Sequence, residues 1–293
     1  YGKTWKLITN GIDRLHFTRV MRADRKVPGL LYAGTEYGMY ISYNDGLNWK
    51  SFQLNLPIVP ITDLTIKNND LIVATQGRAF WVIDDLSMVQ QAKAEITGRN
   101  LHVYDVNPSY RIVGSPFASF RSTPVNAGAN PARGAVINFY AGKVTDSTKG
   151  SVTIMDKNKN VIKTFSTESK DNKLDISKGM NQFNWNLLYP EAEKADAMIL
   201  WNGTPSGNYF ARVKVGADSA DVPFTVVADP NYPISQQDYD AQFAFLQQVQ
   251  GKFNEVQKGV KDIRSTRTQI NDFVAKQGKD CPKEVKQMAD SIN

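Results

Sequence analysis

The chain has 293 residues, of which 41% are hydrophobic and 11% aromatic, with a net charge of +6. This length predicts two or three domains, and the aromatic content favours packed β-sheets. The Lys and Arg residues are dispersed, with no run of five, so we expect no nucleic-acid partner. The absence of any apolar stretch of 18 residues predicts no transmembrane segment.

Cysteine and histidine are scarce. Cys281 is the only cysteine, which excludes an internal disulfide. His16 and His102 have no partner at metal-ligand spacing, and we interpret both as ordinary strand residues. We therefore expect neither a metal site nor a cofactor.

A repeat marks the N-terminal end of the chain. The motif YGKTW aligns with DGLNW, so that Gly2 matches Gly46 and Trp5 matches Trp49 at a spacing of 44 residues. Farther on, LLYAGTEYGMYI aligns with DLIVATQGRAFW at a spacing of 40 residues. A period of this size is typical of β-propeller blades, each a sheet of four strands.

The repeat predicts short strands bounded by Gly, Asn and Asp. We place them at residues 17–24, 29–36, 38–44, 49–54, 61–67, 70–76 and 78–84. Residues 1–106 are thus expected to form C-terminal propeller blades. Two blades cannot close a ring, so we expect further blades, on the same or a separate polypeptide. The alternative is a small, unrelated β-domain.

The segment SYNDGLNW contains a predicted structural turn. Gly46 suits a positive φ, while Ser42 and Asn44, with Asp45 beside them, can bond nearby backbone groups. Trp49 can then pack over the turn. By alignment, Gly2 and Trp5 belong to an earlier copy of this turn.

The residue pattern changes at two points in the middle of the chain. Residues 107–133 are rich in Pro, Gly, Ser and Asn and predict a linker. Residues 134–230 show the alternation of an antiparallel immunoglobulin-like or fibronectin-like β-sandwich. Trp201 lies in a longer insertion between strands, where it either fills the core or faces a ligand.

The C-terminal region, 231–293, predicts a helical tail. Ser235 with Asp238 is typical of a helix N-terminus, and an apolar stripe follows at spacings of three and four residues. We expect one helix at about 235–274 and a second from about Pro282.

The turn and the repeat carry a resemblance to a known family. Ser42, Gly46 and Trp49 match the Asp-box pattern S-x-D-x-G-x-T-W, whereas Asn44 and Asn48 replace its Asp and Thr. The chain resembles the C-terminal part of large bacterial Asp-box (BNR-repeat) propeller proteins with a sortilin-like propeller, often labelled glycosyl hydrolases. This resemblance implies a periplasmic, outer-surface or secreted protein.

The resemblance leaves the activity open. Arg19, Arg22, Tyr40, Asp63 and Asp85 are catalytic candidates by residue type alone, and no catalytic set can be mapped. We therefore expect a non-catalytic portion that serves in protein or glycan binding and assembly, with a glycan or another envelope protein as its partner. The alternative is a glycoside hydrolase, of sialidase or xyloglucanase type, whose catalytic residues lie mostly outside this chain.

Overall fold

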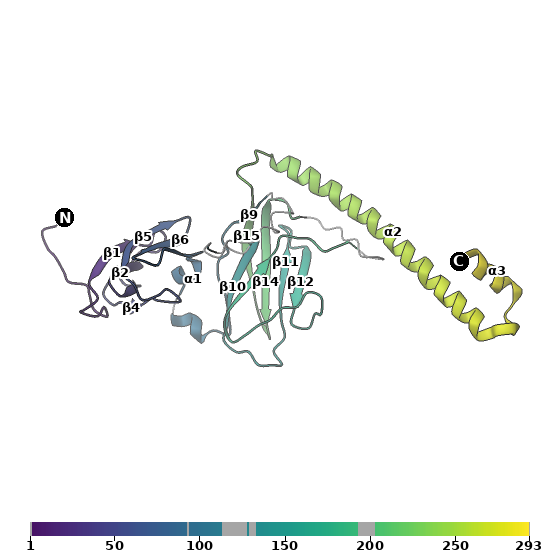
Figure 1. The fold of residues 1–293 in the computed structure, drawn as a ribbon, viewed down its shortest axis with the longest axis horizontal. Helices are drawn as coiled ribbons and strands as arrows, with labels where there is room; N and C mark the ends of the chain where they lie inside the picture. The colour runs from purple at the N-terminus through teal and green to yellow at the C-terminus, as the bar shows by residue number, and fades with distance from the viewer. Residues whose placement is uncertain (1, 93, 113–127, 129–132, 193–202, 293) are drawn as a thin grey trace.

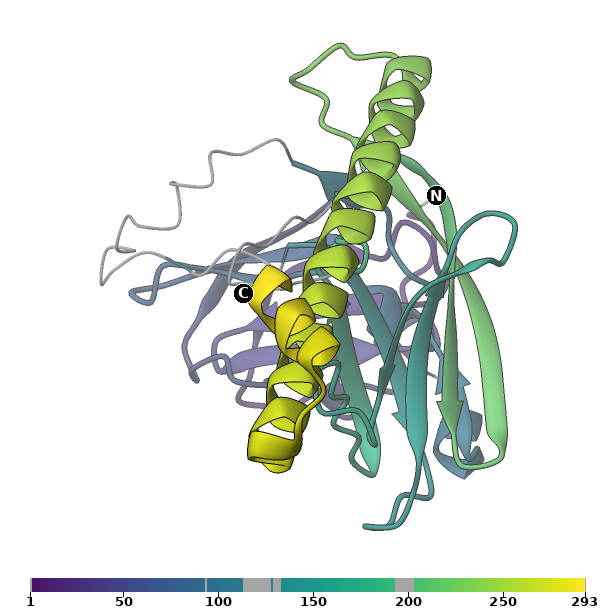
Figure 2. The same cartoon turned by 90° about the vertical axis from the view of Figure 1, so that its right-hand side faces the viewer.

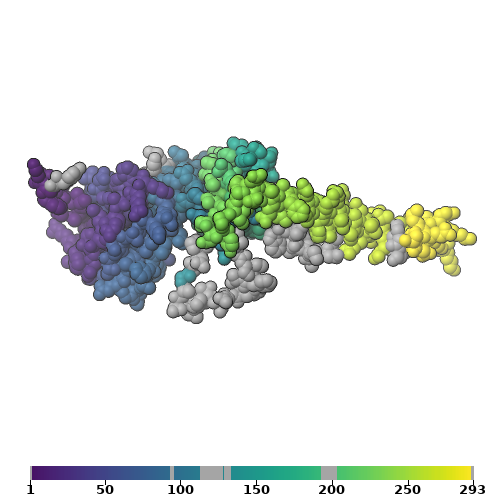
Figure 3. Space-filling view, turned by 90° about the horizontal axis from the view of Figure 1, so that it is seen from above, coloured from purple at the N-terminus to yellow at the C-terminus, as the bar shows by residue number. Residues whose placement is uncertain are grey.

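The computed structural model describes residues 2–92, 94–112, 128, 133–192 and 203–292. Figure 1 shows two β-rich bodies followed by a long helix that extends away from them. The chain is thus mainly β with a C-terminal helix, as its sequence predicts. In the space-filling view of Figure 3, the bodies and the helix form an elongated molecule.

The N-terminal body consists of two antiparallel sheets. The first contains four strands in chain order, β1 (Thr18–Ala23), β2 (Leu31–Thr35), β3 (Gly38–Ser42) and β4 (Lys50–Ser51). The second contains three strands, β5 (Ile61–Lys67), β6 (Asp70–Thr75) and β7 (Phe80–Ile83). All seven strands fall in the segments that the sequence predicts.

The two sheets of this body pack against each other through one apolar cluster. Tyr32 and Leu71, one from each sheet, are fully buried in it. Gly34 permits the close approach, since a Cβ at this position would lie 2.5 Å from Cγ2 of Ile61 and 2.8 Å from Cγ1 of Val20. The backbone of β2 therefore takes part directly in the packing of one sheet on the other.

The outward faces of this body remain partly apolar and open. Met21, on β1, is 47% exposed. Phe80 and Val82, on the edge strand β7, are 76% and 51% exposed. The edge strands β1 and β7 therefore present apolar side chains, whereas β2 and β3 are buried on both faces, because Ala33, Tyr40 and Trp49 form a second apolar cluster.

A polar cluster joins the loop ends of the two sheets. It is centred on α1 (Ser87–Gln90), where Gln90 Nε2 donates to Asp24 Oδ2 at 3.0 Å and to Asn69 Oδ1 at 2.8 Å. The Asp24 carboxylate also accepts from the backbone N–H groups of Lys26 and Val27. Burial raises the pKa of Asp24, but the hydrogen bonds outweigh it and hold this pKa below its ordinary value.

The C-terminal body also contains two sheets. A three-stranded sheet has the order β13-β10-β8, and a five-stranded sheet has the order β12-β11-β14-β15-β9. A short 3-10 helix, η1 (Ala94–Gly98), precedes them. Their strands are β8 (Leu101–Val103), β9 (Ser109–Arg111), β10 (Ala135–Ala141), β11 (Gly150–Met155), β12 (Val161–Ser166), β13 (Gly179–Trp185), β14 (Gly207–Val215) and β15 (Asp218–Ala228).

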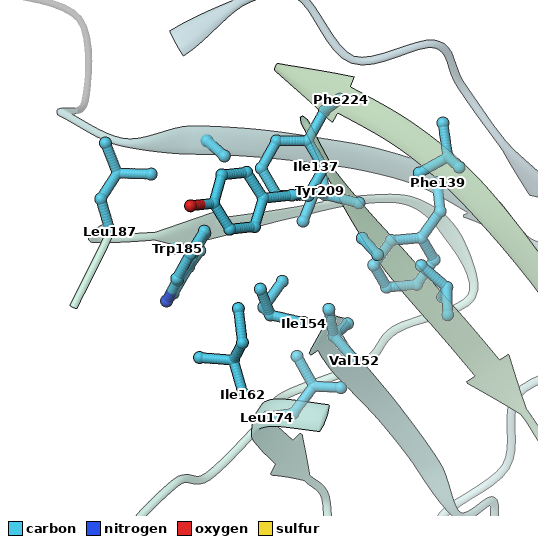
Figure 4. Packing of buried hydrophobic residues seen from close by; sticks show 14 of the residues in the cluster. Ile137, Phe139, Val152, Ile154, Ile162, Leu174, Trp185, Leu187, Tyr209 and Phe224 are labelled. Carbon is cyan, nitrogen blue, oxygen red and sulfur yellow. The ribbon is translucent and has the colours of Figure 1, made fainter. Parts of the chain in front are cut away.

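Both sheets contribute to a single closed core (Figure 4). Trp185 is fully buried, and its ring lies 5.9 Å from that of Tyr209 and 6.0 Å from that of Phe224. Its indole N–H donates to Leu188 O at 3.2 Å, so the one polar atom of the side chain is paired. Such edge-on aromatic packing adds to the free energy of burial.

Two strands of the C-terminal body come from earlier in the chain than the predicted sandwich. β8 lies within 1–106 and pairs with β10, and β9 lies within the predicted linker 107–133 and pairs with β15. The domain boundaries stay predictions. The aromatic residues of the linker, Phe117 and Phe120, lie outside the described residues.

The helical tail agrees with its prediction. Helix α2 (Gln236–Gln277) begins after Ser235, whose hydroxyl accepts from the Asp238 N–H at 3.2 Å. A 3-10 turn, η3 (Gly278–Asp280), leads to α3 (Lys283–Ile292). Figure 2 shows α3 lying alongside the distal part of α2. Among the described residues, no helix combines the length and apolar character needed to cross a membrane.

Candidate binding site

The turn that resembles an Asp-box uses its polar groups internally. Ser42 Oγ donates to Asn44 Oδ1 at 3.0 Å and accepts from the Gly46 N–H at the same distance. Asn44 Oδ1 also accepts from the Asn48 N–H at 2.9 Å. Ser42 is 1% exposed. These polar atoms are occupied by the turn, which therefore positions the strands and is not arranged to hold a ligand.

The backbone of the turn requires residues that tolerate positive φ. Asp45 and Gly46 have φ values of 55° and 79°. A Cβ on Gly46 would lie 2.7 Å from Cδ1 of Ile8, so space as well as conformation favours glycine. Trp49 is 5% exposed and donates from Nε1 to Ile8 O at 2.7 Å. The tryptophan thereby fixes the N-terminal segment to the first sheet.

Three other predicted positions have no defined role. Gly2 has a φ of 80°, as the aligned Gly46 does, but Trp5 is 92% exposed. Their membership in an earlier turn stays a prediction. Trp201 lies outside the described residues, so its predicted contact with a ligand is untested.

The five catalytic candidates do not form one group. Arg22 Nη2 binds Asp63 Oδ1 at 2.7 Å, which links β1 to β5 across the two sheets. Asp85 belongs instead to the polar cluster at α1, where its Oδ1 accepts from the Ser87 N–H at 2.8 Å. Arg19 and Tyr40 lie at the opposite end of the first sheet, in a set of aromatic and charged side chains.

This set, the aromatic–charged cluster, lies where β1 begins and where β2 turns into β3. It consists of His16, Phe17, Arg19, Glu36, Tyr37 and Tyr40. The ring of His16 stacks on Tyr37 with 4.8 Å between centroids, and its Nδ1 lies 2.8 Å from the Tyr40 hydroxyl. The Arg19 guanidinium lies 5.5 Å from the centre of the Phe17 ring and pairs with Glu36.

The β2–β3 turn positions the cluster. Thr35 Oγ1 donates to Gly38 O at 2.9 Å and accepts from the Tyr37 N–H at 3.2 Å. The Glu36 N–H donates to Phe17 O at 3.1 Å, which holds the N-terminal segment beside the turn. Buried Thr35 thus fixes the backbone from which Glu36 and Tyr37 project.

The exposed surface of the cluster combines flat apolar faces with paired charges. Phe17 and Tyr37 are 59% and 51% exposed, whereas Tyr40 is only 8% exposed and supports His16 from below. Exposed aromatic rings beside hydrogen-bonding groups are typical of surfaces that bind polar ligands with apolar faces. The cluster is therefore the candidate ligand-binding surface of the N-terminal body.

Sequence reasoning identified only Arg19 and Tyr40 of this cluster. The interpretation of His16 as an ordinary strand residue is wrong, since it precedes β1 and contacts two tyrosines. The missed signal is the turn sequence Thr35-Glu36-Tyr37-Gly38, which places two long side chains at a hairpin tip. His102, in contrast, lies in β8 as expected.

Outside the cluster, one carboxyl group is a candidate general acid for hydrolysis. Burial and the nearby Asp70 raise the pKa of Asp84, as a general acid would require. Asp70, however, is held as an acceptor of the Asp85 N–H at 2.9 Å. In the part of the chain that the structure describes, no group of three or more His, Cys, Asp or Glu residues is arranged to hold a metal ion.

Comparisons with known proteins do not assign a family. No protein-family model matches the chain, and no curated protein matches it. Two solved structures with some similarity are extracellular domains of putative hybrid two component systems from B. thetaiotaomicron. Their identities are 10% and 9%, both with a TM-score of 0.21. The matches cover 72% of this chain and 26% and 25% of those chains, so this chain spans about a quarter of their length. These TM-scores carry no argument about fold or function.

Proposed function

We propose that this chain is a non-catalytic, ligand-binding portion of an extracytoplasmic Asp-box propeller protein. Its two N-terminal sheets act as adjacent blades, and its C-terminal body is an immunoglobulin-like sandwich that supports them. Further blades, on the same or a separate polypeptide, cover the exposed apolar faces that carry Met21 and Phe80. The resemblance of the sequence to this family supports an envelope or secreted location.

The observation that carries the binding role is the aromatic–charged cluster. Phe17 and Tyr37 are 59% and 51% exposed, although Arg19 lies over Phe17 and His16 stacks on Tyr37. Arg19 and Glu36 satisfy each other's charge beside them. A glycan offers apolar sugar faces with hydroxyl groups at their edges, and an extended peptide offers side chains with backbone groups. Both ligands match rings that are flanked by hydrogen-bonding groups.

A binding experiment with two variants tests this function. We expect an array of envelope glycans or extended peptides to retain the chain. The double variant Phe17→Ala with Tyr37→Ala is expected to lose this retention. The matched control is Tyr110→Ala with Tyr232→Ala, since these tyrosines are 54% and 47% exposed and lie in other parts of the chain. Retention by the cluster variant equal to that of the control would refute a role for the cluster.

The second candidate function is glycoside hydrolysis, supported by the raised pKa of Asp84 beside Asp70. Release of reducing sugar from any glycan on the array, lost in Asp84→Asn, would establish this alternative. We expect both the chain and this variant to bind glycan without releasing reducing sugar.

A further inference from the structure

Trp49 occupies a defined site at the edge of the first sheet. It packs against Ala33 on β2 and Tyr40 on β3 and is 5% exposed. Its Nε1 donates to Ile8 O at 2.7 Å, and its backbone N–H donates to Asn10 O at 2.8 Å. Strand β4 follows directly and pairs with β3. The tryptophan site and the fourth strand of this sheet therefore belong together.

The second sheet repeats the first as far as its third strand. Val73 on β6 pairs with Trp81 on β7, as Ala33 pairs with Tyr40 in the first sheet. Ala33 and Val73 are 40 residues apart, which is the spacing of the repeat. Among the described residues, β4 pairs with β3, but no strand pairs with the far side of β7. The second sheet therefore lacks the strand that would carry an equivalent of Trp49.

A groove lies where this tryptophan would pack. One wall includes Val73 and Trp81 of the second sheet, and the other includes Phe52, Leu54 and Leu56 of the segment after β4. The groove encloses about 30 Å³, so an indole ring must widen it on entering. It can do so at Leu54, because this side chain is 67% exposed and can turn outward.

The segment after β4 repeats the segment that holds Trp49. The residues that contact Trp49 from that segment have matches 44 positions farther on, namely Ile8 with Phe52, Asn10 with Leu54 and Ile12 with Leu56. Among the described residues, the carbonyl groups of Phe52 and Leu54 accept no backbone hydrogen bond. The groove therefore offers the two acceptors that a second tryptophan would use.

The chain contains one other tryptophan in the sequence setting of Trp49. The segment Trp5-Lys6-Leu7 aligns with Trp49-Lys50-Ser51, which includes β4. Trp5 and Leu7 are 92% and 82% exposed. Figure 1 shows the N-terminal segment extending beyond the first sheet. This segment thus has the sequence of a fourth strand, but it pairs with no sheet in the part of the chain that the structure describes.

We propose that Trp5 of a second copy of this chain binds in the groove and that the residues after it add a fourth strand to β7. The Trp5 indole N–H donates to Phe52 O, and its backbone N–H donates to Leu54 O. The following residues pair with β7 as β4 pairs with β3. In such strand addition, main-chain hydrogen bonds contribute affinity and the groove for one side chain contributes specificity.

Trp5 of the same copy cannot reach the groove. Ile8 is fixed beside Trp49 on one face of the first sheet, whereas the groove lies beside Met39, on the other face. The three residues from Ile8 to Trp5 span at most about 10 Å. The spacing of two packed sheets is already about 10 Å, which leaves no length for passing around β4. The association is therefore between different surfaces of two copies, head to tail.

A synthetic peptide of residues 2–8 provides the first probe. We expect it to bind the chain, measured by calorimetry, and to increase the hydrogen-exchange protection of β7. The same peptide with Trp5→Ala is the control and is expected not to bind. No binding of the original peptide up to about 1 mM would refute the proposal.

Two variants of the full chain separate the two halves of the contact. Trp5→Ala keeps the groove, so this variant is expected to lose self-association and still to bind the peptide. Leu54→Arg places a charge at the groove and is expected to weaken both by about tenfold or more. Leu47→Arg is the matched control, since Leu47 is 51% exposed and lies outside the groove, and it is expected to change neither.

A mixture of the two variants tests the head-to-tail arrangement. The Trp5→Ala chain offers a groove and the Leu54→Arg chain offers Trp5. We expect sedimentation to show an equimolar complex at concentrations where each variant alone is monomeric. Both variants are expected to keep ligand retention at the aromatic–charged cluster, so this proposal and the proposed function fail separately.

Two results of sedimentation would overturn the proposal. One is a chain that stays monomeric up to about 1 mM, and the other is self-association that survives both substitutions. Peptide binding without self-association would reject the second copy as occupant and assign the groove to a strand of another polypeptide.

Discussion

The two β-rich bodies bury their apolar residues in different ways. In the C-terminal body, two sheets enclose one core in which Trp185, Ile137 and Val213 are fully buried. In the N-terminal body, two sheets share one buried cluster and the first sheet carries a second, smaller one, while Met21 and Phe80 remain exposed on the edge strands. One body completes its core within the described residues, whereas the other exposes apolar side chains on its edge strands.

The candidate ligand surface lies on the N-terminal body. The aromatic–charged cluster lies at the tip of the hairpin formed by β2 and β3 and at the start of the edge strand β1. The polar surface of the C-terminal body instead carries ion pairs such as Arg212 with Asp221 at 2.7 Å. The edge of an open sheet can present side chains to solvent, whereas a closed core would bury them.

The largest expected effect comes from opening the closed core. Trp185→Ala should destabilise the C-terminal body by about 3–5 kcal/mol, because it leaves a cavity among Tyr209 and Phe224. Amide hydrogen exchange in β11 and β14 measures this loss. Undiminished protection of these strands would contradict the description of a single core.

A smaller loss is expected where the two N-terminal sheets meet. Gly34→Val should cost about 2–3 kcal/mol, because its side chain would overlap Ile61 and Val20. Exchange of β2 and β6 amides measures the effect, and β14 amides serve as the internal reference. A loss shared equally by β14 would mean that the two bodies unfold as one unit.

The polar cluster at α1 should make the folding stability of the N-terminal body depend on pH in the acidic range. The pKa of Asp24 lies below its ordinary value of 3.8, so its carboxylate stabilises the fold above that pH. The stabilisation is lost as the pH falls through the pKa of the folded state. Asp24→Asn should therefore cost about 1.5 kcal/mol at pH 6 and less below pH 3.8.

Denaturant unfolding at several pH values checks this prediction. Gln90→Ala, which removes a donor to the same carboxylate, should shift the acid dependence in the same direction. A cost of Asp24→Asn that stays constant from pH 6 to pH 3 would contradict the role of the charge.

The smallest effect is expected at the ion pair between strands β1 and β5. Arg22→Ala should cost at most about 0.5 kcal/mol, since the side chains of Arg22 and Asp63 are 45% and 62% exposed. Thermal unfolding at low and high salt measures it. A loss of more than about 2 kcal/mol would show that this pair is a main support of the sheet packing.

Much of the local structure follows from the sequence. Short strands between Gly, Asn and Asp, and the cap at Ser235, depend on neighbouring residues, so β1 to β7 and α2 were predicted. The turn around Ser42 also follows, because its hydrogen bonds join residues within seven positions. Local interactions can be predicted from a single sequence, because the residues that form them are close together in the chain.

Contacts between distant segments were not predictable in the same way. His16 meets Tyr40 across 24 positions, and Gln90 meets Asp24 across 66. Strand β9 joins its sheet beside β15, more than a hundred residues farther on. No pattern within either segment specifies such a partner, because pairing depends on how whole sheets pack. The candidate site was therefore found only from the structure.

The N-terminal sheets are open at their edge strands, whereas the C-terminal core is closed. Native-state hydrogen exchange on the intact chain tests this difference most directly. We expect the strongest protection in β11 and β14, and markedly weaker protection in the edge strands β1 and β7. Protection in β1 and β7 equal to that in β14 would contradict it.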